Sequence, residues 1–244
     1  MIPAALRQPV NWRGAAWRIV ESQEQAATRA VTSSADEQAR LEALLDENKP
    51  HYLPGSEHLH WLLKTPFRYP PLRHGSRFGR MTDPGVLYCA RELETAMTES
   101  AVYLWLFRAA LQEIGSLAVI RYDRTAIGFE VDSACTVDLT TAALTTFHGR
   151  ISDPGSYADS QALATTLRNE EVGLILFGSA RRPGGVNCAA LSPAALVPDQ
   201  TPSQTHWHVQ LDAQACWWGR PGERGFEVAY EEVSVAGRIP HPAL

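Results

Sequence analysis

The sequence has few cysteines, no long apolar run and no excess of positive charge, and each shortage excludes a class of protein. Its four cysteines are far apart and include no CxxC pair, which favours buried free thiols in a reducing compartment over a zinc site. No run of about 18 apolar residues occurs, and the first residues hold no apolar segment, so we expect neither a membrane span nor a signal peptide. A formal net charge of −5 argues against direct binding of nucleic acid. We therefore predict a cytoplasmic protein.

Several common catalytic signatures are missing as well. No GxGxxG and no P-loop occurs, which argues against Rossmann and P-loop folds. No GxSxG occurs either, so a nucleophilic serine of the hydrolase type has no support. With 244 residues and 45% hydrophobic content, the chain suits one large domain, or one domain with an extension.

The hydrophobic pattern predicts helices and strands in mixed order. Ser34 and Glu37 have the spacing of a capping box at the start of the first helix. The expected helices are Ala35–Glu47, Ser56–Leu63, Thr95–Leu111 and Tyr157–Arg168. The expected strands are Val86–Cys89, a hairpin of Leu117–Tyr122 and Ile127–Val131 with a turn at Asp123–Ala126, a short edge at Thr136–Leu139, and Gly173–Phe177, Val186–Leu191, Trp207–Leu211 and Phe226–Val235. This order predicts an α+β (mixed α/β) fold with a central β-sheet and flanking helices.

The stretch Pro66–Glu99 and its continuing helix carry most of the candidate chemistry. Glu99 lies in a helical run that is apolar on nearly every face, where a carboxylate is costly to bury unless something pairs with it or uses it. The residues alone favour a helix-start carboxylate stabilised by the macrodipole, with catalysis as the alternative. Arg77 follows Gly75-Ser76 and offers a planar donor fork that suits pyrophosphate, or is a solvated loop arginine.

Other polar residues allow a structural and a functional interpretation. Tyr88 is either a core tyrosine or a ring that stacks on a ligand, and Ser179 is either a turn serine or a hydrogen-bond donor to a ligand. Further arginines that could share a phosphate-binding role are Arg68, Arg73, Arg80 and Arg181.

Two histidine pairs, His58/His60 and His206/His208, have i, i+2 spacing. On a strand this spacing places both rings on one face, which suits a metal ion. No third ligand is evident in the sequence, so we interpret them as surface or core histidines and predict no metal.

Three phrases of the sequence resemble the RES domain, the toxin of bacterial Xre–RES type II toxin–antitoxin systems. They are PFRYPPLRHGSRFG, GVLYCARELETAMTE and GLILFGSARRPGGVNCAAL, and the resemblance covers roughly Trp17 to Trp207. The arginine, glutamate and serine that name the family fall on Arg77, Glu99 and Ser179, and its tyrosine falls on Tyr88. The family commonly has Gly-Gly-Arg-Trp where this chain has Gly-Ser-Arg-Phe.

The resemblance implies a compact fold similar to that of ADP-ribosyltransferase toxins, and an enzyme that cleaves the nicotinamide–ribose bond of NAD by hydrolysis or phosphorolysis. It implies Glu99, Arg77, Tyr88 and Ser179 as catalytic residues, and Arg77, Tyr88, Ser179, Arg68 and Arg181 as the residues that bind NAD, the substrate. One alternative is a mono-ADP-ribosyltransferase that modifies a protein target, and another is an inactive binding subunit. The implied partner is an Xre-type helix-turn-helix antitoxin whose C-terminal end blocks the active site, and a homodimer is compatible with the resemblance. Residues 1–60 are expected to form a helical extension packed on a catalytic domain of residues 61–244.

A single carboxylate fits this chemistry. The nicotinamide of NAD leaves as a neutral group, so no strong general acid is needed, whereas ordinary glycosidases need two carboxylates because their leaving group must be protonated. One carboxylate can stabilise the cation that develops on the ribose and orient the attacking water or alcohol. With the resemblance, Glu99 becomes the catalytic candidate.

Overall fold

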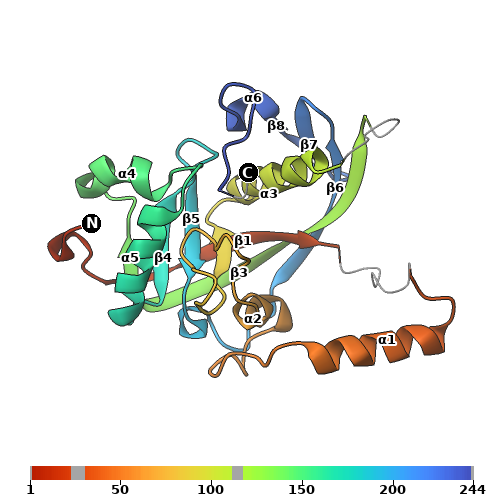
Figure 1. Ribbon diagram of the computed structural model, residues 1–244, viewed down its shortest axis with the longest axis horizontal. Coiled ribbons are helices and arrows are strands. Elements are labelled where there is room, and N and C mark those ends of the chain that lie inside the picture. Colours follow the sequence, from red (N-terminus) through yellow and green to blue (C-terminus); the bar gives the residue numbers. More distant parts are fainter. Residues whose placement is uncertain (1, 23–30, 112–117, 243–244) are drawn as a thin grey trace.

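The computed structural model describes residues 2–22, 31–111 and 118–242. Its centre is an eight-stranded sheet with the order β1-β2-β5-β4-β3-β6-β7-β8, in which β1 also pairs with β3 (Figure 1). The strands are β1 (Val10–Glu21), β2 (Leu87–Ala90), β3 (Ile120–Asp138), β4 (Leu174–Gly178), β5 (Val186–Ala190), β6 (Ser203–Leu211), β7 (Ala215–Gly219) and β8 (Phe226–Ala229). The helices are α1 (Ala35–Asn48), α2 (Trp61–Arg68), α3 (Leu93–Ala109), α4 (Thr145–Ile151), α5 (Ala158–Asn169) and α6 (Tyr230–Val233). The expected mixed α/β class with a central sheet is confirmed.

Strand β3 joins the two halves of the sheet, and it corrects the expected hairpin. Residues 120–138 form one continuous strand, and the residues expected to turn are paired on both sides: Asp123 lies opposite His208 of β6, and Arg124 lies opposite Glu21 of β1. The segment Asp123–Ala126 contains no glycine, proline or asparagine to enforce a turn, and two long neighbouring strands satisfy its backbone. Leu117 lies outside the described residues.

The end of β3 is interior rather than an edge. Thr136 and Val137 pair in parallel with Leu174 and Ile175 of β4, so the expected short edge strand is wrong. Strand β4 in turn pairs with β5 on its other side. Both faces of β4 are buried, which explains why its sequence is an unbroken apolar run.

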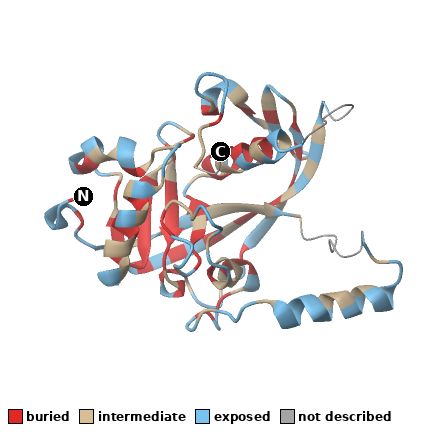
Figure 2. Ribbon diagram, viewed as in Figure 1, coloured by how far each residue is buried: buried red, intermediate tan, exposed pale blue. Residues whose placement is uncertain are grey.

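The core divides according to the faces of the sheet. Leu174 and Leu176 of β4 pack in one cluster with Leu63 and Phe67 of α2. The alternate residues of β4 point to the opposite face and pack with Leu163 and Leu167 of α5 in a second cluster, as the two-residue period of a strand requires. A third cluster joins α3 to β6, β7 and β8 (Figure 2). These layers fix α3 over β1 and β2, where the candidate site lies.

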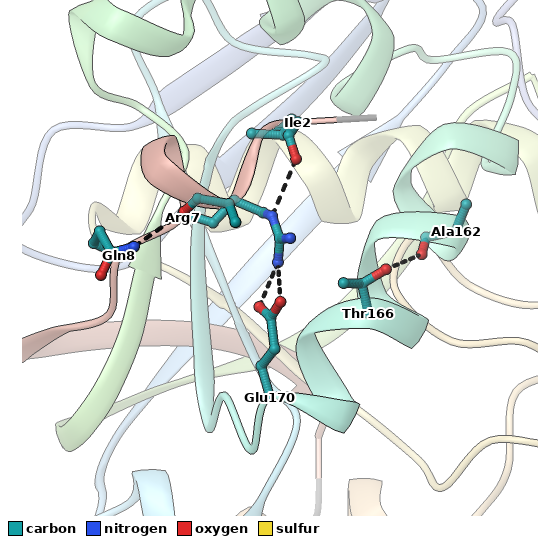
Figure 3. Close-up of polar contacts among 7 residues, drawn as sticks. Ile2, Arg7, Gln8, Ala162, Thr166 and Glu170 are labelled. Atoms are coloured by element: carbon teal, nitrogen blue, oxygen red, sulfur yellow. Dashed lines mark hydrogen bonds and ion pairs between the residues drawn. The ribbon is translucent and has the colours of Figure 1, made fainter.

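The N-terminal residues are only partly the helical extension expected from the sequence. Val10–Glu21 forms β1, a full member of the sheet, so the helical prediction is wrong for these residues. Ile2 is buried in the core, and Arg7 donates to its carbonyl oxygen and to the Glu170 carboxylate at the end of α5 (Figure 3). The expected division of the chain at residue 60 stays a prediction.

Helix α1 begins where the capping box placed it, but it does not pack on the core. Ser34 Oγ accepts from the Glu37 N–H at 3.1 Å, while the Glu37 carboxylate accepts from the Ser33 N–H at 2.7 Å. None of its residues is buried, and the helix lies along the outside of the molecule (Figure 2). Within the described residues, α1 therefore does not pack on the core.

The other expected helices agree with α3 and α5, whereas α2 begins five residues later than expected, at Trp61. His60 is its N-cap, because its Nδ1 accepts from the Leu62 N–H at 3.3 Å. Among the described residues, no helix has the length and apolar content needed to cross a bilayer.

Candidate active site

A cavity of about 350 Å³ lies between β1, β2, α3 and the loop around Arg77. Four of the residues singled out from the sequence line it, namely Arg77, Tyr88, Glu99 and Arg181. Arg68 is not among the lining residues, because its guanidinium lies 4.4 Å from the ring centroid of Tyr52 and donates to the carbonyl of Pro50. The structure therefore brings four candidate residues together and places Arg68 elsewhere.

Glu99 projects into this cavity from α3. It is half-buried, and it lies roughly two turns from the start of the helix at Leu93. The helix macrodipole acts mainly on the first turn, so it gives little reason for a carboxylate at this position. Glu99 Oε1 accepts hydrogen bonds from Ser179 Oγ at 2.7 Å and from Asn187 Nδ2 at 2.6 Å. Both of these bonds fall on one oxygen, and no residue in the described part of the chain donates to the second oxygen, Oε2, which is therefore available to a ligand.

Ser179 serves two structural purposes at once. Its Oγ accepts the backbone N–H groups of Arg181 and Arg182, each at 3.0 Å, and so closes the turn after β4. The same hydroxyl donates to Glu99, so the turn fixes the carboxylate. Ser179 is thus both a turn serine and a partner of Glu99, but the cavity lining does not include it.

Asn187 was not identified from the sequence. It is 7% exposed and lies on β5, where its register partners are Ala90 of β2 and Phe177 of β4. A buried amide needs hydrogen-bond partners, and the Glu99 carboxylate supplies one. The available signal was an asparagine inside an otherwise apolar strand.

Tyr88 holds the loop that carries Arg77. Its hydroxyl donates to Ser76 Oγ at 2.9 Å and accepts from the Phe78 N–H at 2.8 Å. Burial raises the pKa of Tyr88 to about 12, so the phenol is neutral at pH 7 and remains a donor. Tyr88 therefore lines the cavity and, through these two hydrogen bonds, also fixes the loop that positions Arg77.

The same loop depends on Gly75. Gly75 has φ +72°, and a Cβ at this position would lie 2.6 Å from the Gly79 carbonyl oxygen and would collide with Gln161 Nε2. Gln161 of α5 donates to the Ser76 carbonyl at 3.0 Å. The close approach seen here is therefore between the loop and α5.

We expect Gly75→Ala to lower both stability and activity. The left-handed conformation costs an alanine about 1–2 kcal/mol, and the contact with the Gly79 carbonyl oxygen adds to that cost because backbone cannot turn away as the Gln161 side chain can. Gly222→Ala is the matched control, since Gly222 has φ +80° with nothing within 4 Å of the added Cβ. Thermal melting should show the larger loss in Gly75→Ala, and equal losses would contradict the tight packing around Gly75.

Arg77 is held by the last residue of α4 and by the segment that follows it. Its Nη1 donates to the carbonyl oxygens of Ile151 and Asp153, both at 2.9 Å, and its guanidinium lies 5.0 Å from the Tyr157 ring centroid. Because these bonds use one nitrogen, the rest of the donor fork can meet a ligand. Arg181 is similar, since its Nη2 donates to the Pro240 carbonyl at 2.7 Å.

Arg18 is a further lining residue that sequence reasoning missed. It lies on β1 opposite Ile127, and its Nη1 is buried with no hydrogen-bond partner among the described residues. Burial lowers the pKa of Arg18, because the charged form loses its hydration. A buried cationic donor without a partner is the arrangement expected of a group that binds an anion. An arginine inside the strand sequence Trp17-Arg18-Ile19 was the available signal.

Aromatic rings close the other side of the cavity. His241, from the C-terminal segment, lies with its ring centroid 5.6 Å from that of Tyr103 and 6.0 Å from that of Tyr157. Burial lowers the pKa of His241, and the charges of Arg181 and Arg77 lower it further. The imidazole is therefore neutral at pH 7, so the cavity keeps its positive charge on arginines.

Comparisons with known proteins show which family the chain belongs to. The model of the RES domain family matches residues 51–212, which is more than half of the chain. No curated protein matches the sequence. Among solved structures, one similar chain comes from the toxin–antitoxin complex MbcT–MbcA of M. tuberculosis. It is 15% identical, with a TM-score of 0.47, and the alignment covers 84% of this chain and 88% of that one. The matched residues include Arg77, Tyr88, Glu99 and Ser179, and the chain belongs to the RES domain family.

Proposed function

We propose that this protein is the toxin of a toxin–antitoxin pair and that it cleaves the nicotinamide–ribose bond of NAD. The observation that carries the proposal is the Glu99 carboxylate, which Ser179 and Asn187 hold in a cavity that also contains three arginines. Membership of the RES domain family supports the assignment to a toxin. The enzyme is an NAD glycohydrolase or phosphorylase in this proposal.

The carboxylate supplies the charge that the reaction needs. As the bond from ribose C1′ to nicotinamide breaks, the bonding electrons leave with the nicotinamide, which becomes neutral, and positive charge develops on the ribose. Glu99 Oε2 stabilises that cation, while the two bonds to Oε1 prevent the side chain from turning away. The same carboxylate can orient the water or phosphate that attacks C1′.

The arginines supply the positive charge that holds the substrate. Arg18, Arg77 and Arg181 all line the cavity, and guanidinium groups match the oxygen geometry of a pyrophosphate. Tyr88, Tyr103 and Tyr157 offer ring faces for the nicotinamide. An inactive binding subunit would not need a half-buried carboxylate with two dedicated donors, so this alternative has less support.

The products formed from NAD test the proposal. Purified protein is incubated with NAD, with and without inorganic phosphate, and the products are identified by mass spectrometry. ADP-ribose indicates hydrolysis, ADP-ribose-1″-phosphate indicates phosphorolysis, and a mass increase on an added bacterial lysate protein indicates the alternative, ADP-ribosyl transfer. NAD that stays intact under all of these conditions overturns the proposal.

We also propose that a helix-turn-helix antitoxin of the Xre type blocks this cavity in the cytoplasm. Induction of the chain alone should lower cellular NAD and arrest growth, and co-expression of the antitoxin should restore both. Growth arrest with unchanged NAD would contradict NAD depletion as the cause.

A further inference from the structure

Three potential metal ligands meet on the face of the sheet formed by β3 and β6. Asp123 lies directly opposite His208 in the antiparallel register, and His206 lies two residues before His208 on the same strand. Side chains two residues apart on a strand share a face, so both imidazoles lie beside Asp123. None of the three lines the cavity that contains Glu99.

The distances between the ligand atoms fit one small cation. His208 Nδ1 lies 2.8 Å and His206 Nε2 lies 3.4 Å from Asp123 Oδ1, and all three ligand atoms lie within 4.8 Å of one another. Bonds of about 2.0–2.1 Å in a tetrahedral zinc site place neighbouring ligand atoms roughly 3.3 Å apart. We propose that Asp123, His206 and His208 bind Zn²⁺ or a similar divalent transition metal, with the fourth position open to water or an external donor.

The chemistry of the three groups favours this class of ion. Two imidazoles and one carboxylate suit zinc, copper and nickel, whereas magnesium and calcium prefer oxygen ligands alone. The planes of the two imidazole rings are inclined at 81° to each other, with their centroids 5.0 Å apart.

The surroundings leave space on the open side of the site. Asp123 and His208 line a hollow of about 620 Å³, together with Trp217 and Arg220. Gly219 is the register partner of His208 on β7, and the Trp217 ring lies where any Cβ of residue 219 would be. The charge of Arg220 is partly offset by Glu223, whose Oε1 lies 3.3 Å from Arg220 Nη1.

The third ligand could not be found by spacing along the sequence. Asp123 precedes His206 by a long stretch that includes β4 and β5, and only the β3–β6 register joins them. The inference does not depend on the proposed function, because the two sites share no residue.

Zinc titration of the full chain tests the site. After treatment with EDTA and dialysis, isothermal titration calorimetry should show one Zn²⁺ bound per chain, and Zn²⁺ should raise the melting temperature. His206→Ala and His208→Ala should each weaken binding by at least about tenfold, and the double variant should abolish it. Mg²⁺ should give no binding at this site.

His58→Ala is the matched control. His58 Nδ1 lies 3.9 Å from Asp199 Oδ1, so it forms a similar exposed pair. No third ligand joins this pair among the described residues, and the loss of His58 should leave zinc affinity unchanged. Asp123→Asn provides a second test if a histidine variant melts early in EDTA, since it keeps a polar group of the same shape and removes the anionic ligand. Absence of zinc binding by the unmodified chain, or equal binding by the double variant, overturns the proposal.

Discussion

Glu99→Gln is expected to reduce the rate of NAD cleavage by about 10²–10³-fold while NAD still binds. The new amide oxygen can accept the same two hydrogen bonds, from Ser179 and Asn187, so the side chain keeps its position. The amide NH₂ then takes the place of Oε2, and a neutral donor replaces the negative charge next to the developing cation. The loss should therefore fall on kcat rather than on KM. Single-turnover rates at saturating NAD measure it directly.

Two comparisons separate catalysis from a structural role of Glu99. Glu94→Gln changes an exposed carboxylate in the first turn of the same helix and should leave turnover unchanged. Glu99→Ala removes the acceptor of the buried Asn187 amide, so it should also lower the free energy of unfolding, by about 1–3 kcal/mol. If Glu99→Gln melts early but cleaves NAD at the original rate, Glu99 is a structural residue and the proposed mechanism is wrong.

The parts of the fold that sequence reasoning predicted are those decided within a few consecutive residues. The capping residues Ser34 and Glu37 set the start of α1, and the continuous apolar run set α3. The family resemblance placed Glu99 and Ser179 in one site, and the structure brings their side chains into a hydrogen bond. The family resemblance thus predicted a contact between two residues that are far apart in the sequence, which residue spacing alone could not predict.

The parts that it missed depend on pairing between distant strands. Asp123–Ala126 has polar residues typical of a turn, yet β1 and β6 hold it in the middle of a strand. Arg18 and Asn187 are polar residues in strands, and their importance follows only from what lies opposite them. Strand register is not encoded by local spacing, so neither residue could be placed in the cavity beforehand.

Arg18→Met is expected to raise stability and to weaken NAD binding. Met has similar length and no charge, so it removes a cation whose Nη1 is buried without a hydrogen-bond partner among the described residues. Replacing buried charge by a packed apolar side chain stabilises proteins by on the order of 1 kcal/mol or more. A charged hydrogen bond to a phosphate contributes about 1.5–3 kcal/mol, so the dissociation constant for NAD should rise by roughly 10–100-fold.

The measurement is best made in the Glu99→Gln background, in which NAD remains intact during titration. Arg13→Met is the control on the same strand, because the Arg13 side chain is 68% exposed and its Nη1 lies 3.8 Å from the Asp132 carboxylate. It should change neither NAD affinity nor, by more than about 0.5 kcal/mol, stability. A loss of stability in Arg18→Met with unchanged NAD affinity would show that Arg18 supports the sheet, and the anion would then have to be held by Arg77 and Arg181. A gain in stability together with a loss of NAD affinity is the result expected of a cation that binds the ligand. If Arg18 stabilised the fold, its replacement would lower stability instead.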